Sequence, residues 1–403
     1  MYLVEKKTQF SQFINERFNF GENFYLVLFS LYTMSQFYIG TMFPYVFKTT
    51  TFPYNLWFLI SMFALVKVFM CDEYDDWKTL ALCTTVGFLM LISSQKTYNW
   101  NFIYYYVMVI AARNVDYKKI VKVFLCITSI CLIVTIIAAK LRFIPGIVNS
   151  RTGDPGVRYA LGTVFPTDLA ARCFYLLLFY AILRRFKFTM PEYIASVAFT
   201  VLIYVITDTK LDTILMIFTI LSVFFYEPLV KAFQFLGYKI VSLIGLAGVF
   251  AMIMLTYLYS PHNKFFILMD KVLTKRLSNG HRGFVDFNVE LFGQPVPQHG
   301  NGGLHSPHFD YFFIDCSFIR MLLMNGLIVF IIVMATFCYL IKRFLDNKLY
   351  FLAIAVILIV LSSLIDHHMS EISFNIIFLA TFANLGSLTK KKDEPKDYLN
   401  LAQ

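Results

Sequence analysis

The chain has 403 residues, of which 58% are hydrophobic and only 15% are charged. Soluble globular domains carry about a quarter charged residues, so this composition excludes an ordinary soluble enzyme. Repeated apolar runs of about 20 residues instead predict an all-α, polytopic integral membrane protein. The formal net charge of +10 is typical of basic cytoplasmic loops and gives no reason to expect a nucleic-acid ligand.

About 12 transmembrane helices are predicted, each near the length that crosses a bilayer. Residues 1–20 are expected to form a retained cytoplasmic leader, because they lack the apolar core and cleavage site of a signal peptide. The predicted spans are Asn23–Phe43, Pro53–Met70, Thr79–Ser94, Asn101–Ala112, Ile120–Ala139, Thr167–Leu183, Pro191–Thr207, Leu211–Tyr226, Tyr238–Tyr259, Cys316–Ile341, Leu349–Ile365 and Ile372–Leu388. Residues 1–390 thus form a single transmembrane domain, and residues 391–403 form a short cytoplasmic tail.

Lys and Arg in the short loops set the predicted orientation. With 12 spans, four basic groups share one side with both termini, and that side is the cytoplasm. The groups lie at 113–122, 184–187, 342–348 and 390–392. The extracytoplasmic side carries two long loops, 141–166 and 260–315. The acidic turn at 72–76 is interpreted as a solvated cytoplasmic turn.

The stretch from Pro261 to Asn325 is the longest interruption between strongly apolar segments, and it carries most of the histidines. Connections longer than about 12–15 residues are usually functional or disordered. The aromatic content favours a loop that folds over a membrane-embedded site. Neither the seven cysteines nor His299, His305 and His308 match a compact zinc pattern, so no metal site and no cofactor are predicted.

Charged residues at membrane depth are costly and usually face a cavity or a partner. Asp168 and Arg172 lie on one helical face and form either a structural ion pair or part of a polar site that Arg158 also reaches. Lys210, in a tight turn, either extends to the membrane interface or joins that site.

The long loop and the last outer turn contribute further candidates. Arg276 and Arg282 flank His281, in a segment that either rests on anionic headgroups or contributes to a site. Asp315, at the mouth of a span, is a helix N-cap, a general base or both. The same class of position holds Arg320, Asp366, His367, His368 and Glu371.

Five short motifs carry a family resemblance. They are RYALG at 158–162, TDTK at 207–210, KRL at 275–277, LFGQ at 291–294 and IDCSFIRMLLMNG at 314–326. In this order they resemble the Wzy-type polysaccharide repeat-unit polymerases, especially those of Gram-positive capsule and exopolysaccharide clusters. These polymerases share a superfamily with the O-antigen ligases.

The resemblance implies a glycosyltransferase at the outer face of the bacterial plasma membrane. A hydroxyl of one lipid-linked repeat unit attacks the anomeric carbon of the growing glycan, and undecaprenyl diphosphate leaves. The donor is already activated, so neither a nucleotide nor another cofactor is implied. The residues expected to bind the diphosphate are Arg158, Arg172, Lys210, Arg276 and Arg282.

In ligase relatives a histidine at the start of the span after the long loop acts as base. Asp315 occupies the matching position here, so the catalytic base is either Asp315 or the nearby His308. Two other functions are open: a flippase or transporter of lipid-linked oligosaccharides, and a membrane acyltransferase that modifies glycans. Repeated halves and broken helices would favour the transporter. A set of His and carboxylate groups facing the cytoplasm would favour the acyltransferase.

Overall fold

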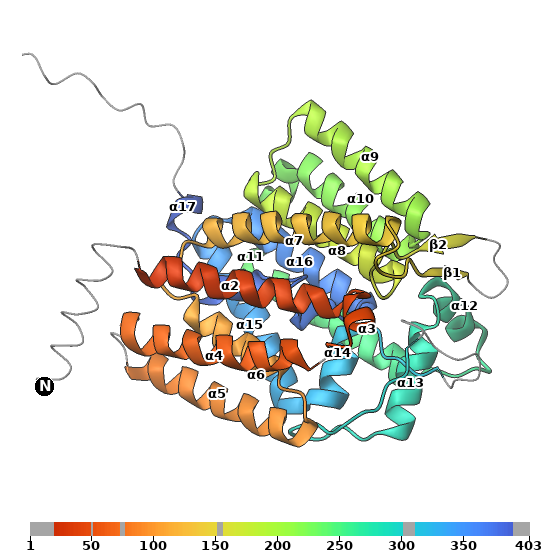
Figure 1. Ribbon diagram of the computed structural model, residues 1–403, viewed down its shortest axis with the longest axis horizontal. Helices are drawn as coiled ribbons and strands as arrows, with labels where there is room; N and C mark the ends of the chain where they lie inside the picture. Colours follow the sequence, from red (N-terminus) through yellow and green to blue (C-terminus); the bar gives the residue numbers. More distant parts are fainter. Residues whose placement is uncertain (1–19, 50, 73–76, 151–155, 301–310, 390–403) are drawn as a thin grey trace, which may run out of the picture.

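The chain folds into a bundle of α-helices with one short β-hairpin (Figure 1). The computed structural model describes residues 20–49, 51–72, 77–150, 156–300 and 311–389. The predicted leader and tail therefore lie almost wholly outside the described residues. Seven helices, α4, α5, α7, α8, α9, α11 and α15, are long and apolar enough to cross a membrane. These helices confirm a helical membrane protein, whereas the number of 12 spans stays a prediction.

The helices follow the predicted apolar segments over most of the chain. The first half contains α2 (Phe20–Ile39), α3 (Phe43–Phe47), α4 (Phe52–Cys71), α5 (Trp77–Thr97), α6 (Asn101–Ala111), α7 (Tyr117–Lys140), and the antiparallel strands β1 (Val148–Ser150) and β2 (Val157–Tyr159). The second half contains α8 (Pro166–Leu183), α9 (Met190–Thr207), α10 (Lys210–Phe224), α11 (Tyr226–Tyr257), α12 (Lys264–Val272), α13 (Arg276–Asp286), α14 (Ser317–Arg320), α15 (Leu327–Asp346) and α16 (Tyr350–Ile365).

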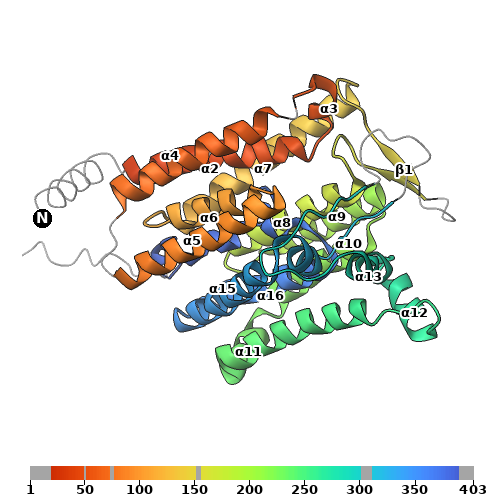
Figure 2. The ribbon, with the colours of Figure 1, turned by 90° about the horizontal axis from the view of Figure 1, so that it is seen from below.

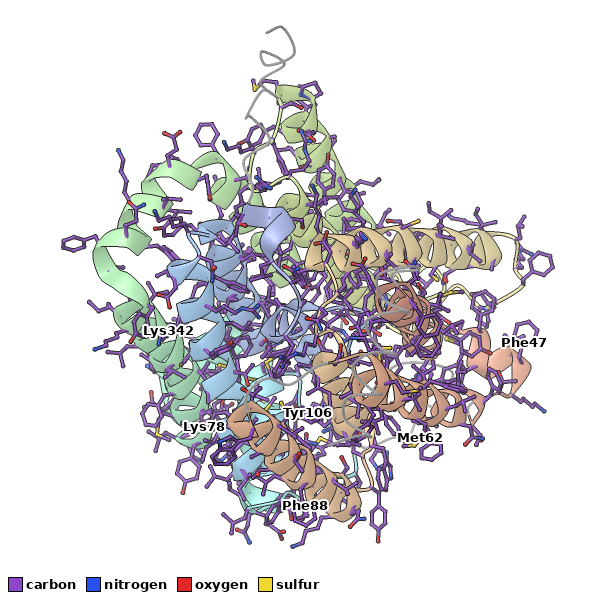
Figure 3. All side chains as sticks on the ribbon, turned by 90° about the vertical axis from the view of Figure 1, so that its left-hand side faces the viewer. Phe47, Met62, Lys78, Phe88, Tyr106 and Lys342 are labelled. Carbon is purple, nitrogen blue, oxygen red and sulfur yellow. The ribbon has the colours of Figure 1, made fainter. Side chains whose placement is uncertain are left out.

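Large apolar side chains cover the outside of the bundle. Phe47, Met62 and Phe88 project away from it in Figure 3, and Phe47 and Phe88 are each more than 60% exposed. Soluble monomers rarely expose apolar surface on this scale, because water makes it unfavourable. The arrangement fits a lipid environment.

Both long loops lie at one end of the bundle. The hairpin β1–β2 and the helices α12 and α13 gather there, at the right of Figure 1 and again in Figure 2, and the short helix α17 (Gly386–Thr389) lies at the opposite end. We call the first end the loop end. The two loops that were predicted to share one side of the membrane therefore lie together in the structure.

The predicted span Cys316–Ile341 is broken in the middle. After α14 comes one π-helical turn, Met321–Asn325, and Gly326 then takes φ 92°, which a side chain would strain. The loop segment 290–294 crosses at this break. Its carbonyls at Glu290 and Leu291 accept the backbone N–H groups of Leu327 and Ile328, at 2.9 and 3.1 Å, so the start of α15 is satisfied.

The last predicted span, Ile372–Leu388, does not form a helix. One 3₁₀ turn, Ile377–Thr381, precedes α17 in this stretch, and another, His368–Ser370, lies just before it. Asn375 and Asn384 explain the error, because both accept a backbone N–H two residues ahead and so compete with helical hydrogen bonding. The prediction rested on apolar composition, which does not distinguish a buried irregular segment from a helix.

Other helices satisfy the backbone of this irregular segment. Tyr105 donates to the Asn375 carbonyl, and Arg343 donates to the carbonyls of Ala380, Thr381 and Ala383. Non-helical backbone at membrane depth is tolerated only where protein or a polar cavity supplies such partners. The segment is therefore an internal element of the bundle and not a lipid-facing one.

Candidate functional site

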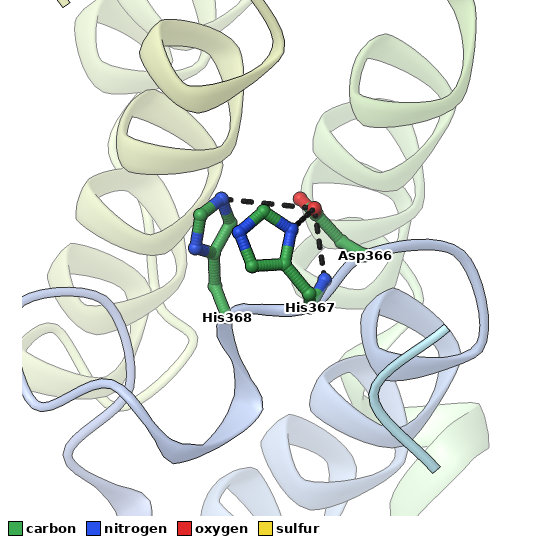
Figure 4. A group of neighbouring side chains, drawn as sticks. All are labelled: Asp366, His367 and His368. Atoms are coloured by element: carbon green, nitrogen blue, oxygen red, sulfur yellow. Dashed lines mark hydrogen bonds and ion pairs between the residues drawn. The ribbon is translucent and has the colours of Figure 1, made fainter. Parts of the chain in front are cut away.

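Ionisable side chains fill the loop end of the bundle where α16 stops. Asp168 comes from the first turn of α8, and Asp366, His367, His368 and Glu371 come from the turn after α16. We call these five residues the loop-end cluster; Figure 4 shows its three consecutive members. The apolar helix α16 ends at Asp366, whose backbone is extended and whose carboxylate accepts the N–H of His367 at 3.0 Å.

His368 lies at the centre of the cluster. Its Nδ1 is 3.2 Å from Glu371 Oε2, and its Nε2 is 3.5 Å from Asp168 Oδ1 and 3.7 Å from Asp366 Oδ1. Its ring stacks on Phe374 with the centroids 3.6 Å apart, which fixes the ring plane. Burial opposes protonation, but the carboxylates of Asp366 and Glu371 outweigh it and raise the pKa of His368 well above its ordinary value.

Glu371 responds to the same pair of effects in the opposite direction. Burial raises its pKa, but the positive charge and hydrogen bond of His368 prevail and lower it to about 2. Glu371 is therefore ionised beside His368.

Arg172 lies beside the cluster as a stacked cation. Its guanidinium is sandwiched between the rings of Phe37 and Phe374, at 4.0 and 4.1 Å from their centroids. The side chain is buried, and within the described part of the chain its Nε and Nη1 have no hydrogen-bond partner. Of the two alternatives for Asp168 and Arg172, the ion pair does not form, because Asp168 faces His368.

A second group of charges adjoins the cluster. Asp315 Oδ2 lies 4.0 Å from Arg276 Nε, which also donates to the carbonyl of Ile365 at the end of α16. Burial raises the pKa of Asp315, although Arg276 partly opposes this effect. Asp315 is not a helix cap, because Cys316 takes the N-cap position of α14 without a side-chain bond.

Aromatic contacts join the two groups. Arg320 donates to Gln298 at 2.9 Å and lies over the ring of Phe313 at 5.1 Å. Phe313 in turn packs edge-on against His367, with the centroids 5.0 Å apart. The long loop thus brings the Arg276 guanidinium and the Asp315 carboxylate against the turn after α16.

The remaining predicted residues lie outside this region or outside the described chain. Arg158 donates to the Thr207 carbonyl at 2.9 Å, which holds it beside the turn that carries Lys210, and Lys210 is exposed. Arg282 forms an exposed ion pair with Asp286 at 3.4 Å. His308 is not among the described residues. The structure therefore pairs Arg276 with Asp315 and places Arg172 beside the adjoining loop-end cluster, whereas Arg282 pairs with Asp286.

Asp212 also belongs to the site, although no motif in the sequence assigns it a role. It is buried in the first turn of α10 and interacts electrostatically with Asp366, Arg276 and His368. A carboxylate one turn inside an apolar helix is a signal for function in itself, because its burial is costly.

Comparisons with protein-family models, with curated proteins and with solved structures find no match for this chain. A functional proposal therefore depends on these side chains and on the motif resemblance.

Proposed function

We propose that this protein polymerises undecaprenyl-diphosphate-linked oligosaccharide repeat units at the outer face of the bacterial plasma membrane, for capsule or exopolysaccharide synthesis. The observation that carries the proposal is the pairing of Asp315 with Arg276 at the loop end, where Arg320 also interacts electrostatically with Asp315 and the buried guanidinium of Arg172 lies beside the adjoining loop-end cluster. The pairing places a proton acceptor beside cations suited to phosphate. With the loop end on the outer face of the membrane, both termini are cytoplasmic.

Asp315 is the base in this mechanism. The acceptor hydroxyl loses its proton to the Asp315 carboxylate as its oxygen attacks the anomeric carbon of the donor, and the bond from that carbon to the diphosphate oxygen breaks. Burial raises the pKa of Asp315, which makes it a better proton acceptor than an exposed aspartate. The side chain keeps partial exposure, so a sugar hydroxyl can reach it.

Arg276 links proton transfer to departure of the lipid diphosphate. It pairs with ionised Asp315 before the reaction, and it loses that charged partner when Asp315 takes the proton. Its guanidinium is then available to the negative charge that grows on the leaving diphosphate. A cation that strengthens its contact in the transition state lowers the barrier and not merely the ground state.

An apolar groove supplies a place for the isoprenoid tail of the substrate. It has a volume of about 290 Å³ and lies between α10, α11 and α16, where Phe218, Leu221 and Leu361 are among its lining residues. Leu361 precedes Asp366 by five residues, about 8 Å along a helix. A lipid in this groove would therefore bring its headgroup to the polar end of α16.

A transporter of lipid-linked oligosaccharides is the second candidate. The break at Gly326 and the irregular segment 366–385 favour it, because interrupted helices around a polar site are typical of transporters. The two candidates make opposite demands on the position of the substrate. A polymerase acts on repeat units already on the outer leaflet, whereas a flippase has to move them there.

Deletion of the protein in its host tests both. We expect single lipid-linked repeat units to accumulate on the outer leaflet and long glycan to disappear, as measured by glycan sizing and by enzymatic labelling of sugars on intact cells. Repeat units that remain on the inner leaflet would establish the transporter. Long glycan of normal length and amount would reject both candidates.

A further inference from the structure

The turn after α16 and the first turn of α8 bury polar atoms that form no hydrogen bond. Among the described residues, Asp168 Oδ1, Asp366 Oδ2, His367 Nδ1 and His368 Nε2 are all inaccessible to solvent and form no hydrogen bond. Buried polar atoms are almost always bonded, so four such atoms in one place need an explanation. They come from side chains that are themselves buried or nearly so, and each is an atom type that binds metal ions.

The spacing of these atoms fits a metal ion. Zinc binds imidazole nitrogen and carboxylate oxygen at 2.0–2.2 Å in a tetrahedral arrangement, which places the ligand atoms about 3.3–3.6 Å from one another. The carboxylate of Asp366 approaches the histidines through Oδ1, the oxygen that also accepts the His367 N–H, at 3.6 Å from His367 Nδ1 and 3.7 Å from His368 Nε2, and its Oδ2 is the oxygen without a hydrogen bond. Asp168 Oδ1 is 3.5 Å from the same His368 Nε2. The donor atoms of Asp366, His367 and His368 all lie within 4.8 Å of one another (Figure 4).

The partner of His368 supports the same conclusion. Its Nδ1 lies 3.2 Å from Glu371 Oε2, so the proton of a neutral ring belongs on that nitrogen. Nε2 then faces the carboxylates of Asp168 and Asp366, so either a proton on Nε2 or a metal ion between these groups has to offset their negative charge. A histidine that ligates a metal commonly donates its other N–H to a carboxylate in this manner.

We propose that Asp366, His367 and His368, with Asp168 as the fourth ligand, bind a divalent transition-metal ion such as Zn²⁺, and that Glu371 orients His368 toward it. Imidazole and carboxylate donors together select this class of ion. The ion ties the turn after α16 to the first turn of α8. Four protein ligands are typical of a structural ion, so the site stabilises the loop end whatever reaction occurs there. The proposal is independent of the proposed polymerase function.

Metal analysis of the full-length protein in detergent tests the site. Protein purified without chelators is expected to hold about one equivalent of metal by elemental mass spectrometry, and Zn²⁺ added back after chelation should restore the unfolding temperature. Co²⁺ in the emptied site should give the visible absorption of a tetrahedral ion. A monodisperse protein with neither stoichiometric metal nor a Co²⁺ spectrum would overturn the proposal and would leave a protonated His368 as the balancing charge.

Variants separate ligands from their surroundings. Asp366→Asn and His368→Gln should lose the stoichiometric metal and the Co²⁺ spectrum. Glu371→Gln should keep both but weaken Zn²⁺ affinity by about 10- to 100-fold, as a residue that orients a ligand does. His262→Gln, an exposed histidine at the same end, is the matched control and should bind as the wild type does. Equal Zn²⁺ affinity in all four variants would reject the assignment. If a ligand variant does not fold, the wild-type stoichiometry still decides the question.

Discussion

The two ends of the bundle bury charge in different ways. Away from the loop end, Lys67 is enclosed between α4 and α6, where its amine donates to both oxygens of Asp72 and to the carbonyls of Ala111 and Arg113 at 2.6–2.9 Å. At the loop end, Arg172 and His368 retain buried nitrogens without hydrogen-bond partners. A buried charge with every donor satisfied serves the fold, whereas one with vacant donors or acceptors is prepared for a ligand.

The largest effect is expected at the satisfied end. Lys67→Met should lower the free energy of unfolding by about 3–5 kcal/mol, because it leaves the Asp72 carboxylate buried without its counter-charge. Unfolding in mixed micelles measures the loss. The exposed Lys231→Met on α11 is the control and should be neutral. The double variant Lys67→Met with Asp72→Leu should recover most of the stability; failure to recover would mean that Lys67 acts through its bonds to the backbone carbonyls and not through the ion pair.

Asp315→Asn should have the opposite profile, with a large effect on activity and a small one on stability. Removal of a general base slows the reaction by about 10²–10⁴-fold. Polymer formation from purified lipid-linked repeat units measures it. His299→Ala, an exposed residue of the same loop, is the control and should retain most activity. If His299→Ala proves the more harmful change, the base lies elsewhere in the loop.

The pH profile sharpens this assignment. A base acts only when ionised, so the rate should fall as the pH drops through the pKa of Asp315. Burial raises that pKa, so the loss should begin at a higher pH than for an exposed aspartate. Asp315→Glu should retain a shifted acidic limb. An unchanged acidic limb in Asp315→Asn would assign the titration to another group.

The sequence predicted the parts of this molecule that depend on local composition. Continuous apolar runs fixed most helices, because a helix at membrane depth needs only apolar side chains and its own hydrogen bonds. It failed at Ile372–Leu388, where an equally apolar run relies on Tyr105 and Arg343 from distant helices for its hydrogen bonds. The solvated turn predicted at 72–76 was wrong for Asp72, which is buried against Lys67 of α4, and residues 73–76 lie outside the described residues.

In the candidate site too, local sequence predicts some residues, whereas contacts between distant helices determine others. Asp315, Arg276 and Arg172 were selected because charge beside an apolar span is costly, and the structure brings them to one end of the bundle. The contact of Asp168 with His368 could not be selected in this way, because 200 residues separate the two and no local pattern pairs α8 with the turn after α16. Charge identifies candidate residues in a membrane protein, but only the packing of helices shows which of them meet.

The smallest expected effect concerns the apolar groove, and it tests whether the loop end is supplied with lipid from the membrane. Leu221 lines the groove and Leu243 of α11 does not, yet both are exposed on the outside of the bundle. Leu221→Trp should fill space that the isoprenoid tail needs and cost about 1 kcal/mol of substrate binding, a rise of about fivefold in KM with kcat unchanged. Leu243→Trp should leave both constants unchanged, because its side chain meets only bulk lipid. An equal rise in both variants would mean that the substrate does not distinguish this groove from the rest of the apolar surface, and the polar cluster would then have to receive its lipid by another path.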